Sequence, residues 1–344
     1  MESAGVARHR QVGGKRARPD PKFYCGSGKV VEIRALADEL NAAFVVFNHE
    51  LSPAQQRNLE KELDRRVLDR TEVILEIFAQ RAQTAEGKVQ VELAQLEHLS
   101  TRLIRGWSHL ERQRGGFGST GGPGEKQLEL DRRYIAQRVK VLKAKLIQLK
   151  KQRQVQRRAR ARGEVLSVAI VGYTNAGKST LFNALTHAKA YEADKLFATL
   201  DTTTRRVWLA DAGNVTVSDT VGFIRELPHK LVAAFRATLE ETVHADLLLH
   251  VVDASSPVRD QQAQAVDAVL AEIPAGSAPR LLVWNKIDVA ALEPGVERDQ
   301  YGRISRVFVS ARSGAGMDRL RDAIAEFAQS RKASAPETQS LQPH

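Results

Sequence analysis

Apolar and polar positions follow three different patterns along this chain of 344 residues. In the first quarter, short apolar runs alternate with helical spacing, which predicts a helix over residues 30–40 and a strand over residues 43–47. A second helix is predicted to begin after Ser52, because Pro53 follows it and Gln55 stands three positions on. The first part of the chain therefore predicts a small α/β domain.

The middle of the chain shows heptad spacing on two arms. The seam positions are Val89, Leu93, Leu96, Ser100, Leu103, Trp107 and Leu110 on the first arm, and Ile135, Val139, Leu142, Leu146 and Leu149 on the second. Two such arms with a short connection should pack as an antiparallel, coiled-coil-like helical hairpin. The connection, residues 115–125, holds six glycines. This composition favours a mobile binding tip on a rigid arm, with a flexible linker as the alternative.

The last half of the chain alternates short, mostly apolar runs with helical patterns. The runs span residues 166–171, 215–217, 281–284 and 307–309. Four motifs, each at the end of such a run, imply an α/β fold with a doubly wound, mostly parallel sheet. Ligands of such sheets bind at the carboxyl ends of the strands, and each run is followed by a candidate motif.

The first of these motifs is Gly172-Tyr-Thr-Asn-Ala-Gly177-Lys178-Ser179, between an apolar run and a helical pattern. Glycines allow backbone N–H groups to surround phosphates, Lys178 reaches the β- and γ-oxygens, and Ser179 ligates Mg²⁺. A plain strand-turn-helix is the alternative. The candidate nucleotide-binding residues are Gly172, Asn175, Ala176, Gly177, Lys178, Ser179 and Thr180.

Three later motifs extend the nucleotide site. Asp219 follows a strand-like run and can hold Mg²⁺ through water, while Gly222 can offer its N–H to a γ-phosphate. In Asn285-Lys286-Ile-Asp288, the carboxylate can accept both guanine donors, N1–H and N2–H₂, and would be left unpaired by adenine. The segment Ser310-Ala311-Arg312 adds a backbone N–H for guanine O6. The combination predicts a P-loop GTPase domain that binds GTP.

Position 223 is Phe, where many GTPases of this fold carry a water-positioning Gln. Hydrolysis should then be slow until a partner completes the site. Asn175 has two interpretations, a ligand for K⁺ beside the phosphates or a simple turn residue. A loop Thr should reach Mg²⁺, with Thr203 favoured and Thr204 the rival. The predicted catalytic residues are Lys178, Thr203, Gly222 and Asn175, and the predicted Mg²⁺ ligands are Ser179, Thr203 and Asp219.

The net charge of +11 is concentrated in residues 132–163, which contain no Asp or Glu. Thirteen Lys or Arg residues in that segment imply a polyanion nearby, and a single aromatic, Tyr134, favours phosphate contact with structured RNA over base stacking. A solvated coiled-coil face is the alternative. One cysteine, Cys25, excludes an internal disulfide. We expect a monomeric, cytoplasmic protein, with a peripheral membrane location left open, and neither DNA nor an integral membrane segment.

Further strings resemble one family, the HflX-type ribosome-associated GTPases. They are Leu51-Ser-Pro-Ala-Gln-Gln-Arg-Asn-Leu59, Val67-Leu-Asp-Arg70-Thr71, Ile77-Phe-Ala-Gln-Arg-Ala82, Val91-Glu-Leu-Ala-Gln-Leu96, Gly122-Pro-Gly-Glu125, Gln127-Leu-Glu129, Asp131-Arg-Arg133 and Asp219-Thr-Val-Gly-Phe-Ile-Arg225. The resemblance covers residues 20–330. It implies an N-terminal α/β domain (1–87), a helical hairpin with a glycine-rich tip (88–163), a GTPase domain (164–330) and a disordered tail (331–344).

The resemblance also implies binding of the large ribosomal subunit, splitting of stalled or idle ribosomes, and GTP hydrolysis stimulated by that subunit. A ribosome-assembly or RNA-binding GTPase that does not split ribosomes is the alternative, and a signalling switch with a protein-binding coiled coil is a third hypothesis. The chain departs from the family pattern at Thr202, where Pro is usual, and at Lys126, where Thr is usual. We also expect a clipped N-terminus and no extra C-terminal domain of the kind that some members carry.

Overall fold

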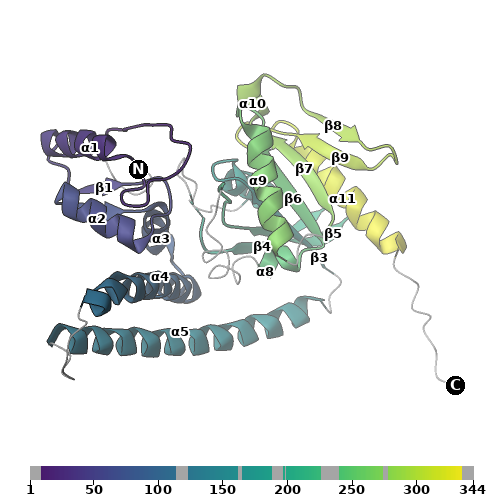
Figure 1. Cartoon of the computed structure of the whole chain (residues 1–344). Helices are drawn as coiled ribbons and strands as arrows, with labels where there is room; N and C mark the ends of the chain where they lie inside the picture. Colours follow the sequence, from purple (N-terminus) through teal and green to yellow (C-terminus); the bar gives the residue numbers. More distant parts are fainter. Residues whose placement is uncertain are drawn as a thin grey trace. The chain divides into compact units, whose positions relative to one another are not determined.

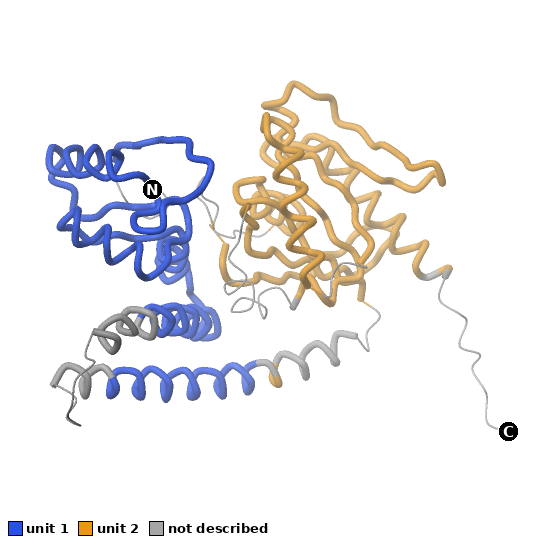
Figure 2. Tube along the Cα trace, viewed as in Figure 1, with its two compact units in different colours: residues 1–150 blue, residues 151–344 orange. Residues whose placement is uncertain are grey.

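The computed structural model (Figure 1) describes residues 9–113, 123–161, 165–187, 197, 199–225, 240–273 and 278–334. By backbone contacts the chain divides into two compact units, residues 1–150 and residues 151–344 (Figure 2). No helix in the described ranges is both long and apolar enough to cross a membrane. The three domain boundaries expected from the sequence stay a prediction, and the tail from residue 335 lies outside the described residues.

The first unit begins with three helices around two short parallel strands. The elements are α1 (Ser27–Glu39), β1 (Phe44–Val46), α2 (Pro53–Leu63), β2 (Arg66–Leu68) and α3 (Arg70–Arg81), with Val45 opposite Val67 in the register. The capping signature at Ser52 forms in full, because its Oγ accepts from Gln55 N at 3.2 Å and Gln55 Oε1 accepts from Ser52 N at 2.9 Å. Gly26 is the N-cap of α1.

A small apolar core holds this part of the first unit together. Its buried residues are Phe23, Val30, Phe47, Leu51, Leu59, Leu63 and Val67. Leu59 and Val67 are completely buried, so α2 and β2 pack their apolar faces against each other. Removal of this surface from water stabilises the fold by about 25 cal/mol per Å².

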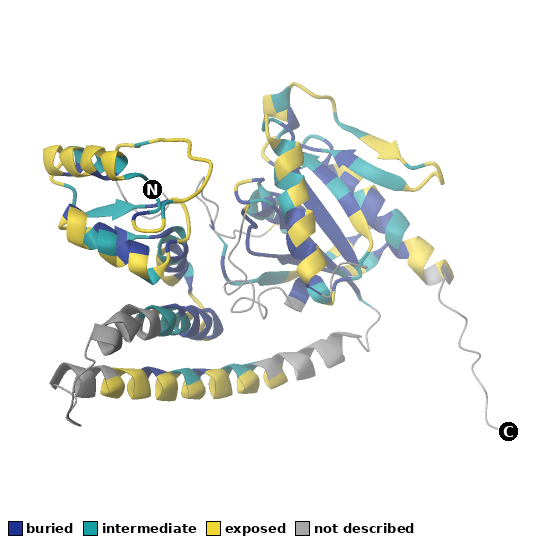
Figure 3. Cartoon of the chain, viewed as in Figure 1, coloured by how far each residue is buried: buried dark blue, intermediate teal, exposed yellow. Residues whose placement is uncertain are grey.

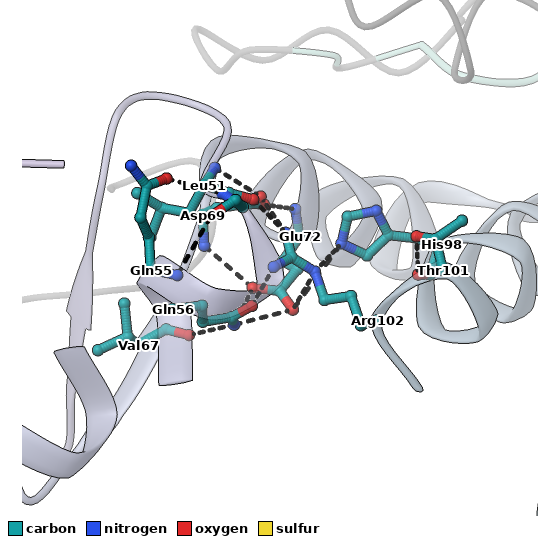
Figure 4. A network of polar contacts seen from close by, with 10 residues as sticks. Leu51, Gln55, Gln56, Val67, Asp69, Glu72, His98, Thr101 and Arg102 are labelled. Atoms are coloured by element: carbon teal, nitrogen blue, oxygen red, sulfur yellow. Dashed lines mark hydrogen bonds and ion pairs between the residues drawn. The ribbon is translucent and has the colours of Figure 1, made fainter. Parts of the chain in front are cut away.

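A polar network connects α2 and α3 to α4 (Ala85–Gln113), as Figure 4 shows. Arg102 of α4 forms an ion pair with Asp69, whose side chain has no exposed surface, and also donates to Gln56. Asp69 is at the same time the N-cap of α3, where its Oδ1 accepts from Glu72 N at 2.9 Å. This network fixes α4 to the α/β part of the unit.

The long helices α4 and α5 (Pro123–Ala161) pair along the expected seam. Val89 and Leu93 of α4 form a buried cluster with Leu142 of α5, and Leu96, Val139 and Leu146 pack against it. Two ion pairs cross between the helices, Arg138 to Glu92 at 2.7 Å and Lys143 to Glu97 at 2.8 Å. The helical hairpin predicted from the heptads is confirmed, while its tip between the helices, residues 114–122, lies outside the described residues.

The second unit is built on a seven-stranded sheet in the order β4-β5-β3-β6-β7-β9-β8. Its strands are β3 (Leu166–Gly172), β4 (Thr203–Leu209), β5 (Gly213–Asp219), β6 (Leu247–Asp253), β7 (Arg280–Asn285), β8 (Gly295–Arg298) and β9 (Ile304–Phe308). The edge strands β4 and β8 are antiparallel to their neighbours, and all other pairs are parallel. The predicted α/β fold with a mostly parallel sheet is confirmed.

Helices cover both faces of this sheet. They are α6 (Lys178–Thr186), α8 (Glu240–Val243), α9 (Arg259–Glu272), α10 (Ile287–Ala290) and α11 (Met317–Ser334). Side chains of α6 and α11 share one apolar core with β3, β5 and β6, whereas α9 contacts β6 from the other face. The central strands β3 and β6 are buried almost throughout (Figure 3). The carboxyl ends of the parallel strands thus meet on one edge of a rigid platform.

Candidate GTP-binding site

A cavity of about 530 Å³ opens at the carboxyl ends of the parallel strands. It is lined by Thr174, Asn175, Gly177, Lys178, Ser179, Thr180, Phe197, Thr199, Thr220, Gly222, Asn285, Lys286, Asp288, Val289, Ser310, Ala311 and Arg312. The predicted motifs, far apart in the sequence, therefore share one pocket of a size typical for small ligands.

The phosphate loop follows β3 and opens α6. Asn175 and Gly177 both have left-handed backbone conformations, with φ of 63° and 90°. Gly177 also has no room for a side chain, because a Cβ there would lie 2.2 Å from Asn285 Nδ2. The loop consequently leaves its backbone N–H groups at the N-terminus of α6, where a phosphate is favoured by the free donors and the helix dipole.

Lys178 is buried beneath this loop, and its ammonium donates to Tyr173 O at 2.9 Å. Burial lowers the pKa of Lys178 to about 8, although the charge of Asp219 opposes the shift. A buried ammonium with one carbonyl partner retains donors for an anion. The side chain is thus poised for the phosphate contacts expected from the sequence.

Three side-chain oxygens converge beside the lysine. Ser179 Oγ lies 2.8 Å from Asp219 Oδ2 and 2.7 Å from Thr199 Oγ1, which lies 2.9 Å from the same carboxylate oxygen. Asp219 is completely buried, its Oδ1 has no hydrogen-bond partner among the described residues, and burial raises its pKa. An oxygen-rich set with a poorly compensated carboxylate suits a hard divalent cation such as Mg²⁺.

Thr199 was not among the residues expected from the sequence. The predicted ligand, Thr203, is the first residue of β4 and stands opposite Asp219 in the antiparallel register. The rival, Thr204, lies 2.9 Å from Ser218 through its hydroxyl. The four threonines within six positions gave no sequence signal for choosing among them, because the path of the loop decides which one reaches the carboxylate.

Gly222 and Phe223 lie against the phosphate loop. Phe223 N donates to Gly172 O at 3.1 Å, and Thr174 N donates to Phe223 O at 2.8 Å, so the two segments form a short parallel bridge. A Cβ on Gly222 would lie 3.0 Å from Lys178 Nζ, which explains the need for glycine beside the ammonium. The ring of Phe223 is only 1% exposed and belongs to the interior.

The guanine-binding motif is tied directly to the phosphate loop. Asn285 Nδ2 donates to Ala176 O at 2.9 Å, and Asn285 Oδ1 accepts from Ala311 N at 3.0 Å. This one amide therefore connects three of the four motifs. Asp288, in the first turn of α10, is exposed and lines the cavity, while Ser310 is fully buried behind it.

Two further residues near the cavity were missed by the sequence interpretation. Asp253 at the end of β6 binds the ammonium of Lys286 at 2.7 Å. Thr174 has a buried hydroxyl without a partner among the described residues. The sequence did not indicate Asp253, because its contact is with Lys286, which follows a different strand. It did not indicate Thr174, because Thr174 stands at a variable position of the G-x-x-x-x-G-K-S pattern.

Three family models match successive parts of the chain. They are described as "GTP-binding GTPase N-terminal" over residues 1–79, "GTP-binding GTPase Middle Region" over 81–160 and "50S ribosome-binding GTPase" over 167–286. Their order corresponds to the α/β part, the helical hairpin and the sheet that carries the cavity.

Individual proteins are also similar to this chain over most of its length. The chain is 53% identical over 327 residues to "GTPase HflX" of Escherichia coli (strain K12), which covers 95% of this chain and 76% of that protein. It is 52% identical over 300 residues to "GTPase HflX" of Magnetococcus marinus, covering 87% of this chain and 69% of that protein. The solved complex of SsGBP with GDP is 25% identical, covers 92% of this chain and 89% of that chain, and has a TM-score of 0.50.

Proposed function

This chain belongs to the HflX family of GTPases, and we propose that its GTP-bound form binds the large ribosomal subunit and splits stalled or idle ribosomes. Binding and hydrolysis of GTP follow from the family and the P-loop GTPase domain. Hydrolysis then resets the protein for release. The ribosomal step is the part that goes beyond the family assignment.

The observation that carries this step is a set of three exposed cations on α5. Arg132, Lys140 and Lys145 are exposed and have no hydrogen-bond or ion-pair partner among the described residues. Arg133 of the same helix is instead paired with Glu129 at 2.7 Å. Free guanidinium and ammonium groups on a rigid helix suit the phosphates of structured RNA. The description "50S ribosome-binding GTPase" of the matched family model supports the same partner.

In the nucleotide site, each group has a defined task. Lys178 and the Gly222 N–H hold the γ-phosphate, and Asp288 pairs with guanine while Asn285 braces the two halves of the pocket. Ser179 and Asp219 would hold Mg²⁺, for which the unpartnered Asp219 Oδ1 and the converging hydroxyls are suited. When bound, this ion neutralises charge that develops on the phosphate oxygens. Thr199 and Thr203 compete for the remaining loop position.

The proposed cofactors also include a monovalent cation, K⁺. Asn175 is exposed at the cavity in a left-handed conformation, which suits both a turn residue and a K⁺ ligand. If its side-chain oxygen holds K⁺ beside the phosphates, replacement of K⁺ by Na⁺ at matched ionic strength should slow hydrolysis. Equal rates in both salts would leave Asn175 with the turn role alone.

Ribosome splitting is tested by light scattering of intact ribosomes mixed with the full chain and GTP. We expect a fall in scattering as subunits separate, and co-sedimentation with large subunits in the presence of a GTP analogue. Replacement of residues 115–124 by a short polar turn should preserve GTP binding and subunit binding but abolish splitting. If the altered chain splits ribosomes at the normal rate, the hairpin is an anchor only and the assembly-factor alternative is favoured.

Charge reversal tests the anchoring role of α5. The triple change of Arg132, Lys140 and Lys145 to Glu should weaken subunit binding and reduce the salt dependence by roughly one log-log unit per lost contact. The matched control reverses three other exposed cations of the same unit, Arg34, Arg57 and Lys61. Equal weakening in both variants would mean that net charge, and not these three cations in particular, drives binding.

A further inference from the structure

Thr174 presents an unexplained buried hydroxyl within the phosphate loop. The residue is 5% exposed, and its Oγ1 has no hydrogen-bond partner in the part of the chain that the structure describes. Buried polar atoms without partners are destabilising and uncommon in native proteins. Thr174 also lines the cavity, so a ligand bound there can supply the partner of this hydroxyl.

The location of Thr174 indicates which part of the ligand is concerned. A Cβ built on Gly222 would meet Thr174 Cγ2 at 2.8 Å and Lys178 Nζ at 3.0 Å. The threonine side chain, the ammonium and Gly222 thus meet at one point of the cavity lining. Since Lys178 and Gly222 are the groups expected at the γ-phosphate, Thr174 lies at the reacting end of GTP.

The backbone around Thr174 is fixed from both sides. The bridge between Tyr173 and Phe223 is closed by the hydrogen bonds from Thr174 N to Phe223 O and from Phe223 N to Gly172 O. Rotation about the Cα–Cβ bond of Thr174 exchanges its methyl and hydroxyl groups without moving this frame. The ring of Phe223, on the other strand of the bridge, is buried in the interior.

We propose that the Thr174 hydroxyl orients the attacking water in GTP hydrolysis, a task for which Phe223 offers no polar atom. The water oxygen forms a bond to the γ-phosphorus, and the bond from that phosphorus to the oxygen shared with GDP breaks. The proton of the water passes to the released phosphate. Thr174 accepts a hydrogen bond from the water, and its own protonation does not change.

The test compares Thr174→Val, Thr174→Ser and Thr174→Ala in single-turnover hydrolysis of GTP by the full chain. Valine has the shape of threonine without the hydroxyl, and its rate should fall on the order of 10²-fold. The Kd for GTP should change by less than about twofold, since the contact acts in the transition state and not in ground-state binding. Serine should retain most of the rate, whereas alanine should be as slow as valine.

The matched control is Thr242→Val in α8. Thr242 is also fully buried with an unpartnered hydroxyl, but it does not line the cavity. Both valine variants should keep or raise the Tm, and Thr242→Val should hydrolyse GTP at the normal rate. A normal rate in Thr174→Val, an equal loss in the control, or equal rates in the serine and alanine variants would each overturn the proposal. The serine and alanine pair decides the question if Thr174→Val fails to fold.

Discussion

The ammonium of Lys286 donates a hydrogen bond of 2.7 Å to Oδ2 of Asp253, which links the guanine-binding motif to the end of the neighbouring strand β6. The other carboxylate oxygen accepts from Ser255 N at 3.0 Å and from Ser255 Oγ at 2.6 Å. Lys286 has a left-handed backbone with φ of 66° and lines the cavity. Asp253 thus holds in place a lysine that stands between two predicted guanine-site residues, Asn285 and Asp288.

Asp253→Asn should weaken GTP and GDP binding while leaving the rate of bound GTP hydrolysis unchanged. The amide keeps the shape but loses the charge-assisted bond to a partly exposed lysine, so we expect a loss of about 1 kcal/mol, or roughly fivefold in Kd. Titration calorimetry measures this change in Kd. Asp260→Asn is the control, because Asp260 is 86% exposed at the start of α9 and does not line the cavity. Unchanged affinity in Asp253→Asn would contradict a positioning role.

The same pair predicts a pH dependence of stability. Burial alone would raise the pKa of Asp253, but hydrogen bonds from Lys286 and Ser255 outweigh it and lower the pKa below its ordinary value. A carboxyl with a lowered pKa stabilises the fold above its unfolded pKa of about 3.9, and this contribution is lost as pH falls through the folded value. The difference in unfolding free energy between wild type and Asp253→Asn should be constant from pH 7 to about 5 and shrink below. Urea titrations at several pH values test this, and a constant difference down to pH 3 would contradict it.

Asp288→Asn should exchange guanine for xanthine selectivity. The amide leaves one guanine donor unpaired, which should cost GTP binding about 2–4 kcal/mol, whereas it can donate to the extra O2 acceptor of xanthosine triphosphate. Competition titrations with both nucleotides measure the change. Undiminished affinity for GTP would remove Asp288 from the guanine pocket. Asp318→Asn on α11 serves as a control outside the cavity lining.

Substitution of Thr199 and substitution of Thr203 should change the Mg²⁺ requirement of GTP hydrolysis to different extents. Thr199→Val removes a hydroxyl that contacts both Ser179 and Asp219, so it should raise the Mg²⁺ concentration needed for half-maximal hydrolysis by about tenfold. Thr203→Val should have the larger effect if the nucleotide-bound loop instead brings Thr203 to the ion. Mg²⁺ titrations of both variants, with Thr204→Val as the control, decide between the two threonines.

Arg102→Met should strongly destabilise the first unit. Its loss leaves the completely buried carboxylate of Asp69 without its cation, a change that typically costs about 3–5 kcal/mol. Arg65→Met is the matched control, because Asp38 in that pair is 57% exposed, and its loss should cost less than about 1 kcal/mol. Chemical denaturation measures both. Equal, small losses would show that the network in Figure 4 does not fix α4 to the α/β part.

The sequence by itself determined the elements whose physics is local. The capping box at Ser52 and Gln55 needs only neighbours in the chain, and it forms in the structure as predicted. The sequence also predicted the hairpin seam from Val89 to Leu146, because helical spacing directs those side chains to one face of each helix whatever the partner is. The strand-like runs predicted the parallel sheet, because each is followed by a nucleotide motif and ligands of such a sheet bind at the carboxyl ends of its strands.

Only the tertiary structure decided which distant groups meet. Asn285 reaches Ala176 across 109 positions, Lys286 reaches Asp253 across 33, and Arg102 reaches Asp69 across the same separation. Thr199 contacts Asp219 although Thr203 pairs with it in the strand register. The residues next to these threonines and carboxylates in the chain do not indicate which of them will make a contact. Strand order, register and the path of the connecting loop set which of them come within hydrogen-bond distance, and those depend on how the whole chain packs.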